Sequence, residues 1–130
     1  MPWTVTFDAG PAIVHTTFTG LVPPEDLEAA VQATLALAVA HGALRFLADC
    51  RGLEGGHSLF DLFEKAQRVE RSGLSRCVRE AVVMPANVRV RSDVQFWETV
   101  ARNRGFEVRV FPDLDSAVAW LTEAAAPAPG

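Results

Sequence analysis

The chain alternates between segments with a two-residue hydrophobic period and segments with a helical period. Trp3, Val5 and Phe7 alternate with threonines, which predicts a β-strand. Residues 8–11 have turn chemistry, and a second β-rich run covers residues 12–18. Because the connection between the two runs is short, we expect them to form an antiparallel hairpin.

A helix signal follows the hairpin. Pro23 and Pro24 suit the first turn of a helix, and the acidic residues directly after them lie near its positive end. An apolar stripe runs along this segment, and Gly42 is a natural stop. The mostly apolar run at residues 44–50 is typical of a buried parallel strand, and we expect a glycine-rich loop over residues 51–56.

The rest of the chain repeats this alternation of helix and strand. The expected elements are a helix from Ser58 to Gly73, a strand over 81–84, a helix behind Ser92, a strand over 106–110 and a last helix capped by Asp113. Ser92 with Gln95 three residues later predicts a capping box. The last strand alternates apolar and charged residues, which predicts an edge position.

The order of elements, β-β-α-β-α-β-α-β-α, predicts an α/β domain with a mixed, mostly parallel five-stranded sheet and four helices. The 130 residues are 49% hydrophobic and 22% charged, which suits one domain over residues 1–123. The segment 124–130 is rich in Ala and Pro, and we expect it to be disordered.

Composition also bears on location. The N-terminal residues have neither a basic start nor an apolar run, and no apolar stretch is long enough to span a bilayer. The two cysteines, Cys50 and Cys77, make no disulfide framework. We therefore expect a soluble, cytoplasmic protein with reduced thiols.

The net charge of −4 is spread unevenly along the sequence. Residues 65–109 hold ten basic and five acidic residues, whereas the rest of the chain holds two basic and eleven acidic ones. The basic residues are nearly all arginines, which suit carboxylate or phosphate partners, and salt bridges between faces of the domain are the alternative. An acidic chain argues against duplex nucleic acid as a partner.

Three stretches carry a resemblance to a known family. Residues 46–53 read FLADCRGL, a strand that ends in Asp before a glycine-containing loop; residues 96–105 read FWETVARNRG, and residues 108–121 read VRVFPDLDSAVAWL. With them, and with its order of elements, the chain resembles the SpoIIAA-like branch of the STAS domains. The resemblance implies a STAS-type fold and a regulatory or protein-interaction role. Because this branch borders on CRAL-TRIO-type lipid carriers, it also implies a second role in carrying lipid.

Ser58 has two interpretations. In anti-sigma-factor antagonists of the family, a serine at the start of the helix after the third strand is phosphorylated, and counting on from Asp49 places Ser58 there. The chain reads His-Ser-Leu-Phe at this point, where those antagonists have Asp-Ser-Ser-Gly. With Asp61 three residues later, Ser58 also fits a capping box. A helix N-terminus stabilises a phosphate too, so the two roles are compatible.

Polar residues gather where two of the predicted parallel strands end. Asp49 ends one strand, where open α/β sheets place their ligands, or it holds the N–H groups of the loop that follows. The residues before the third helix could collect an anion or an acidic partner loop, or form an ordinary solvated loop. The candidate interaction or ligand residues are Asp49, Arg51, His57, Ser58, Asn87, Arg89, Arg91 and Ser92.

No pattern indicates catalysis or metal binding. Cys50 ends an apolar strand, which indicates burial rather than a reactive thiolate. His15, His41 and His57 have no metal-ligand spacing, and neither a carboxylate pair nor a Ser–His–Asp arrangement can be recognised.

Phe60, Phe96 and Trp120 lie off the main apolar stripes, so they broaden a buried face or line a pocket or dimer interface. The sequence favours a non-enzymatic regulatory or protein-interaction module without cofactor or metal. The alternative is a carrier of a small apolar ligand or lipid, and an enzyme is the third hypothesis. The alternating last strand and the spare aromatics permit a homodimer.

Overall fold

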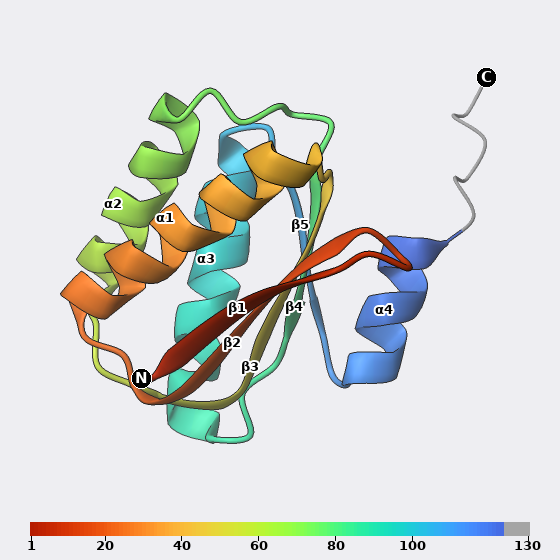
Figure 1. The fold of residues 1–130 in the computed structure, drawn as a ribbon. Coiled ribbons are helices and arrows are strands. Elements are labelled where there is room, and N and C mark those ends of the chain that lie inside the picture. Colours follow the sequence, from red (N-terminus) through yellow and green to blue (C-terminus); the bar gives the residue numbers. More distant parts are fainter. Residues whose placement is uncertain (124–130) are drawn as a thin grey trace.

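A computed structural model describes residues 1–123, which form five strands and four α-helices (Figure 1). In chain order the elements are β1 (Trp3–Asp8), β2 (Ile13–Leu21), α1 (Pro24–His41), β3 (Arg45–Gly55), α2 (Leu59–Arg71), β4 (Arg79–Val83), the 3-10 helix η1 (Val88–Val90), α3 (Arg91–Asn103), β5 (Glu107–Phe111) and α4 (Leu114–Thr122). The predicted fold class and order of elements are confirmed. The expected disorder of residues 124–130 lies outside the described residues.

The strand order of the sheet follows the chain order, β1-β2-β3-β4-β5. β1 pairs with β2 in antiparallel fashion, and the remaining neighbours are parallel. Thr6 lies opposite His15 in the hairpin, and Asp49 lies between Thr17 of β2 and Val83 of β4. This confirms the opening hairpin and the edge position of the last strand.

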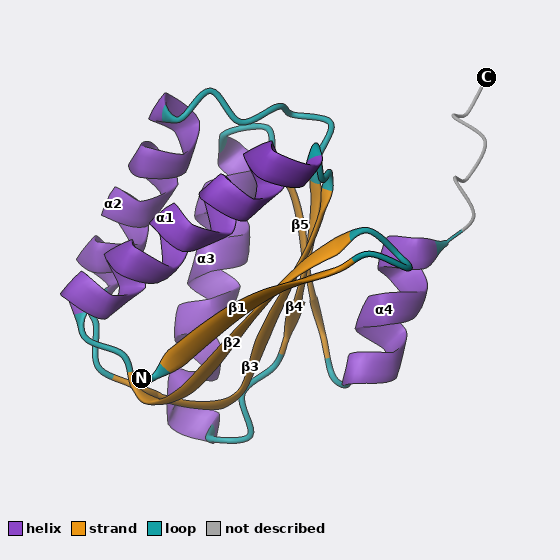
Figure 2. Cartoon of the chain, viewed as in Figure 1, coloured by secondary structure: helices purple, strands orange, loops and turns teal. Residues whose placement is uncertain are grey.

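The helices are distributed unequally over the two faces of the sheet (Figure 2). Each parallel connection moves one strand further along the sheet, and right-handed crossovers therefore place α1, α2 and α3 on one face. The larger hydrophobic core, with Phe46 and Trp97, lies beneath them. α4 packs on the other face against β3, β4 and β5, where Leu47 and Leu121 belong to a smaller core.

Two predicted boundaries are wrong. Residues 51–55, expected in a loop, continue β3, because β2 also runs on to Leu21 and pairs with β3 as far as Gly55. Ser92 does not cap α3: the helix begins at Arg91, with Val90 as its N-cap and without a side-chain cap. The preceding turn, η1, leads directly into the helix and occupies the position that a capping side chain would need.

Gly56 fits tightly against the end of β2. Its φ is +104°, and a Cβ atom there would lie 2.6 Å from the backbone nitrogen of Val22. We expect Gly56→Ala to lower the free energy of unfolding by about 3 kcal/mol or more, because it adds a backbone clash to a left-handed conformation. Urea unfolding followed by circular dichroism measures the change.

Gly42→Ala is the matched control. Gly42 also has a positive φ, +60°, but no atom lies within 4 Å of its Cβ position. This substitution should cost only about 1 kcal/mol, the strain of a left-handed alanine. Equal losses for the two variants would show that the close approach to Val22 does not constrain the fold.

Candidate functional site

The connections that follow β2, β3 and β4 meet at the end of the sheet where the parallel strands finish. We call residues 21–23, 51–60 and 84–92 the carboxyl edge. Val22 donates its N–H to the Gly55 carbonyl (2.7 Å), and its own carbonyl lies 2.9 Å from His57 Nδ1. Asn87 Nδ2 donates to Glu54 Oε2 (2.6 Å). These bonds hold the three connections together, so most of the predicted candidate residues lie at one edge.

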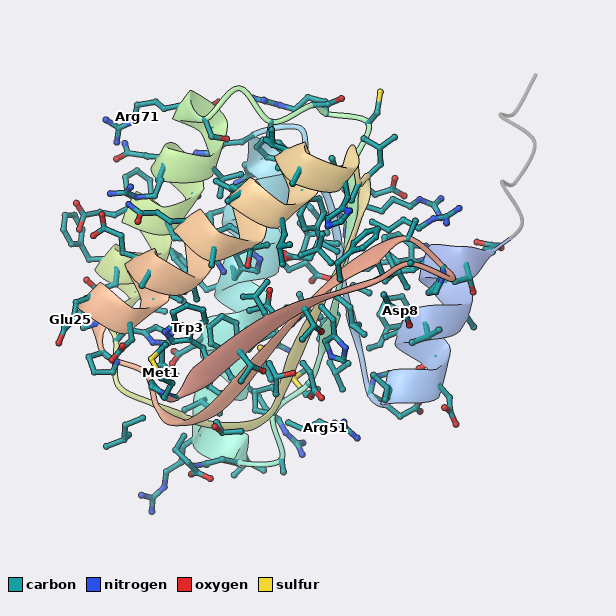
Figure 3. The ribbon with its side chains drawn as sticks, viewed as in Figure 1. Met1, Trp3, Asp8, Glu25, Arg51 and Arg71 are labelled. Atoms are coloured by element: carbon teal, nitrogen blue, oxygen red, sulfur yellow. The ribbon has the colours of Figure 1, made fainter. Side chains whose placement is uncertain are left out.

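Asp49 of the central strand β3 is fixed by Arg51 on the face of the sheet that carries α4, near the carboxyl end of the strand, where Arg51 is labelled in Figure 3. Arg51 Nε and Nη2 donate to the two carboxylate oxygens at 2.9 and 2.7 Å, and the Arg51 backbone N–H donates to Oδ1 at 3.1 Å. Asp49 is only 6% exposed, and its hydrogen bonds with the Arg51 side chain lower the pKa of the carboxyl group below 3.8. The geometry is that of a structural clamp rather than of an open ligand group.

Cys50 points to the opposite, helix-covered face of the sheet and is fully buried. Burial disfavours the thiolate and raises the pKa of the Cys50 thiol to about 12. The thiol is therefore protonated at neutral pH and shielded from reagents. Cys77, by contrast, is exposed.

Ser58 caps α2 with the predicted capping box. The Asp61 N–H donates to Ser58 Oγ (3.2 Å), and the Ser58 N–H donates to Asp61 Oδ2 (2.7 Å). The Ser58 hydroxyl also donates to Asp61 Oδ2 at 3.0 Å. A phosphate on Ser58 would thus meet a carboxylate as well as the helix N-terminus, and the two effects oppose each other.

The predicted polar and basic residues before α3 differ in whether their side chains are already engaged in hydrogen bonds. Asn87 accepts the Arg89 backbone N–H (2.9 Å) and so caps η1, and Arg91 Nε donates to the Pro85 carbonyl (3.0 Å). The Arg89 guanidinium has no hydrogen bond or ion pair among residues 1–123. Arg89 is therefore the cation of this edge that is available to a partner.

The carboxyl edge also exposes large apolar side chains. Leu21 and Phe60 are each 65% exposed, Val88 is 68% exposed and Leu59 is 47% exposed. They come from all three connections of the edge, at the end of β2, the start of α2 and η1. Exposed apolar side chains gathered in this way mark a binding surface more often than single ones do.

Sequence reasoning identified Phe60 of this group but missed Leu21, Leu59 and Val88. Leu21 and Val88 lie in or beside connections, where no periodic pattern assigns a face, and a search for apolar residues outside the periodic segments would have found them. Leu59 belongs to the apolar stripe of α2, which predicts burial. That prediction is wrong, because Leu59 is the first residue of the helix and lies at the exposed carboxyl edge. Trp120, by contrast, is buried in the smaller core, and Phe96 is half-buried against the larger one.

The interior holds little free space. A cavity of about 70 Å³ lies between the sheet and the helices, with Phe18, Phe46 and Trp97 in its wall. Small-molecule sites usually occupy about 300 Å³ or more. A larger groove, about 640 Å³, lies between α1 and α2, but charged residues such as Glu28, Glu64, Lys65 and Arg68 line it. Neither space suits a lipid.

Within residues 1–123, no group of three or more His, Cys, Asp or Glu side chains is placed to hold a metal ion. The helices described are all too short or too polar to cross a bilayer.

In the comparison with protein families, the SpoIIAA-like family model matches residues 13–122, from the start of β2 to the end of α4. Neither the comparison with curated proteins nor that with solved structures returned a match.

The two thiols should react very differently. In the native protein a thiol reagent at neutral pH should label Cys77 and leave Cys50 unmodified, because Cys50 is buried and protonated. Cys77→Ser should then show no labelling until urea unfolds it, as followed by intact-protein mass spectrometry. Rapid native labelling of Cys77→Ser would contradict the assigned burial of Cys50.

Asp49 should make the free energy of unfolding depend on pH in the acidic range. Its pKa is lowered in the folded protein, so the stability it contributes is present above the unfolded-state pKa of 3.8 and is lost as the pH falls through the folded-state pKa. Asp49→Asn should therefore lower the free energy of unfolding at neutral pH, and the deficit should shrink in acid. Urea unfolding over a pH series measures this. Glu64→Gln, a change at an exposed carboxylate on α2, is the control and should show no such trend.

Proposed function

The chain belongs to the SpoIIAA-like family, and from this membership we propose that it is a non-enzymatic interaction module that binds a protein partner at its carboxyl edge. The family supports a regulatory or interaction role in general. The observation that supports the location is the exposure of Leu21, Leu59, Phe60 and Val88 at one edge of the sheet.

The partner chemistry follows from this surface. Val88, Phe60 and Leu21 are the most exposed large apolar side chains of the edge, and burying such side chains against a partner contributes favourable binding energy. Arg89 stands beside Val88 with a free guanidinium, which suits a carboxylate at the rim of the interface. A partner with an apolar surface bordered by an acidic side chain fits best.

The alternatives find less support. A carrier needs a larger apolar cavity than the 70 Å³ between sheet and helices. An enzyme that uses Cys50 or Asp49 would need a free thiolate or carboxylate, whereas the first is buried and protonated and the second is bound by Arg51. Ser58 is best described as a helix cap, because Asp61 would oppose a phosphate there.

We propose that the protein acts in the cytoplasm. Reduced thiols are typical of that compartment, and the chain carries an exposed thiol at Cys77 and a buried one at Cys50.

The test begins by identifying the partner. A photo-crosslinking amino acid replaces Phe60 in cells of the natural host, and in a parallel strain it replaces Val39. Val39 is 83% exposed at the far end of α1 and serves as the control position. A protein that crosslinks at position 60 but not at 39 is then purified for affinity measurement. Crosslinks at position 39 alone would place binding elsewhere.

The purified partner allows a quantitative comparison. Phe60→Ser with Val88→Ser should raise the dissociation constant about tenfold or more, because it removes two large apolar contacts. Val39→Ser with Leu44→Ser removes two exposed apolar side chains at the opposite end of the sheet and should leave the constant unchanged. Calorimetry measures both. Equal weakening by the two pairs would sink the proposal.

The charge contribution can be separated by salt. Arg89→Gln, alone or with Arg91→Gln, should weaken binding mainly at low ionic strength, because exposed charges are screened in salt. The single variant isolates the free guanidinium, since Arg91 also bonds the Pro85 carbonyl. Unchanged affinity at low salt for the double variant would remove the arginines from the interface.

A further inference from the structure

β1 forms one border of the sheet (Figure 1). A border strand pairs on one side only, so half of its backbone groups point away from the sheet. The Thr19 N–H donates to the Pro2 carbonyl (2.9 Å), which fixes the phase of the antiparallel ladder. Hydrogen-bonded and non-hydrogen-bonded pairs alternate, so Thr4 and Thr6 bond to β2. The N–H and C=O groups of Trp3, Val5 and Phe7 consequently face outward from the sheet.

The opposite border is closed to another strand. Glu98 of α3 accepts the outward N–H of Val110 in β5 (2.9 Å), and β5 carries the charges of Glu107 and Arg109. Such charges and covers are the usual devices that keep sheet edges from pairing. β1 has no such protection. The segment from Trp3 to Phe7 contains no charged residue and no proline.

The sequence of β1 is symmetric in chemical type about its centre. Residues 3–7 read Trp-Thr-Val-Thr-Phe, so an aromatic residue, a threonine and a central valine recur in mirrored order. We propose that a second copy of this chain pairs antiparallel with β1 about a two-fold axis at Val5, which joins the two sheets into one. The interface is isologous, as closed dimers require.

This register satisfies both the backbone and the side chains. Val5 pairs with Val5 of the partner subunit and Trp3 with Phe7 of the partner subunit, and these are the residues whose backbone groups face outward. Thr4 comes to lie opposite Thr6 of the partner subunit on the outer face. Aromatic pairs and threonine pairs of this kind stabilise neighbouring strands.

α1 supplies a second contact beside the strand. A two-fold axis perpendicular to the sheet places the two α1 helices on the same face of the joined sheet. Glu28 pairs with Arg68 of α2, and Ala30 and Ala38 are buried against the core. The flank turned away from α2 carries small residues at helical spacing, namely Ala29, Ala33, Ala36 and Ala40. Its alanines let two helices pack closely, at about 8 Å, and its charged residues, Glu25 and Asp26, lie in the first turn of the helix.

Trp3 fits the same arrangement. Its indole Nε1 is buried without a hydrogen-bond partner among residues 1–123. Phe7, at the other end of the mirrored motif, carries the His41 ring stacked on it at 3.9 Å. In the dimer the stack of Phe7 and His41 of the partner subunit lies next to Trp3 and packs against its ring, while the indole N–H itself is covered by its own chain.

The test uses two double variants that differ in the sign of one charge. Thr4→Lys with Thr6→Lys places lysine opposite lysine across the two-fold axis, and it should raise the dimer dissociation constant about tenfold or more, less so at high salt. Thr4→Lys with Thr6→Glu places lysine opposite glutamate and should leave the dimer intact. Sedimentation equilibrium reports the mass against the 14.1 kDa of one chain.

Both threonines are exposed, so neither variant disturbs the core, and circular dichroism confirms that each is folded. Wild-type protein and the Lys/Glu variant at twice the chain mass, with the Lys/Lys variant dissociated, support the pairing. A wild-type mass of one chain at the highest soluble concentration overturns it. So does an equal dissociation constant for the two variants, which would place a dimer interface elsewhere.

Discussion

The strand order of the sheet follows the chain order, and the parallel strands are joined by right-handed crossovers. The rest of the architecture depends on these two constraints together. Every parallel connection must return over the same face, so α1, α2 and α3 form one layer. The helix after the last strand is free of this rule, and α4 covers the opposite face. A nine-residue helix is too short to cover five strands, and it packs mainly on β3, β4 and β5, with Ile13 at the start of β2 in the same core.

The uneven cover explains the chemistry of the outer face. Where α4 lies, the strands present Leu47, Ala81 and Val83 to a second core. Beyond α4, the outward residues of β1 and β2 are Thr4, Thr6, His15, Thr17 and Thr19, which are polar and keep high strand propensity. The Asp49–Arg51 pair lies at the boundary between the two regions. There the carboxylate can be buried because its charge is matched at once by a neighbour two residues along the same strand.

The sequence predicted the fold well where the signal is local. Alternating apolar residues identified β1, and proline and capping residues located the starts of α1, α2 and α4. It failed where a distant partner decides. β3 continues to Gly55 only because β2 runs alongside, and η1 rather than Ser92 begins α3. The candidate site was half predicted: strand ends located its polar residues, but the exposure of Leu21, Leu59 and Val88 depends on which faces the tertiary structure leaves uncovered.

The proposed partner surface lies at the carboxyl edge, whereas the proposed dimer contact lies along β1. The geometry of the dimer constrains how the two contacts combine. A two-fold axis perpendicular to the sheet reverses the strand direction, so the carboxyl edges of two subunits would point to opposite ends of the joined sheet. They could not merge into one larger surface around a single small partner. Each edge would hold a separate partner molecule, with the affinity of either edge unchanged, and avidity would arise only for a partner that is itself multivalent or long enough to reach both ends. A dimer of this form would therefore control which partners are brought together rather than how tightly each is bound.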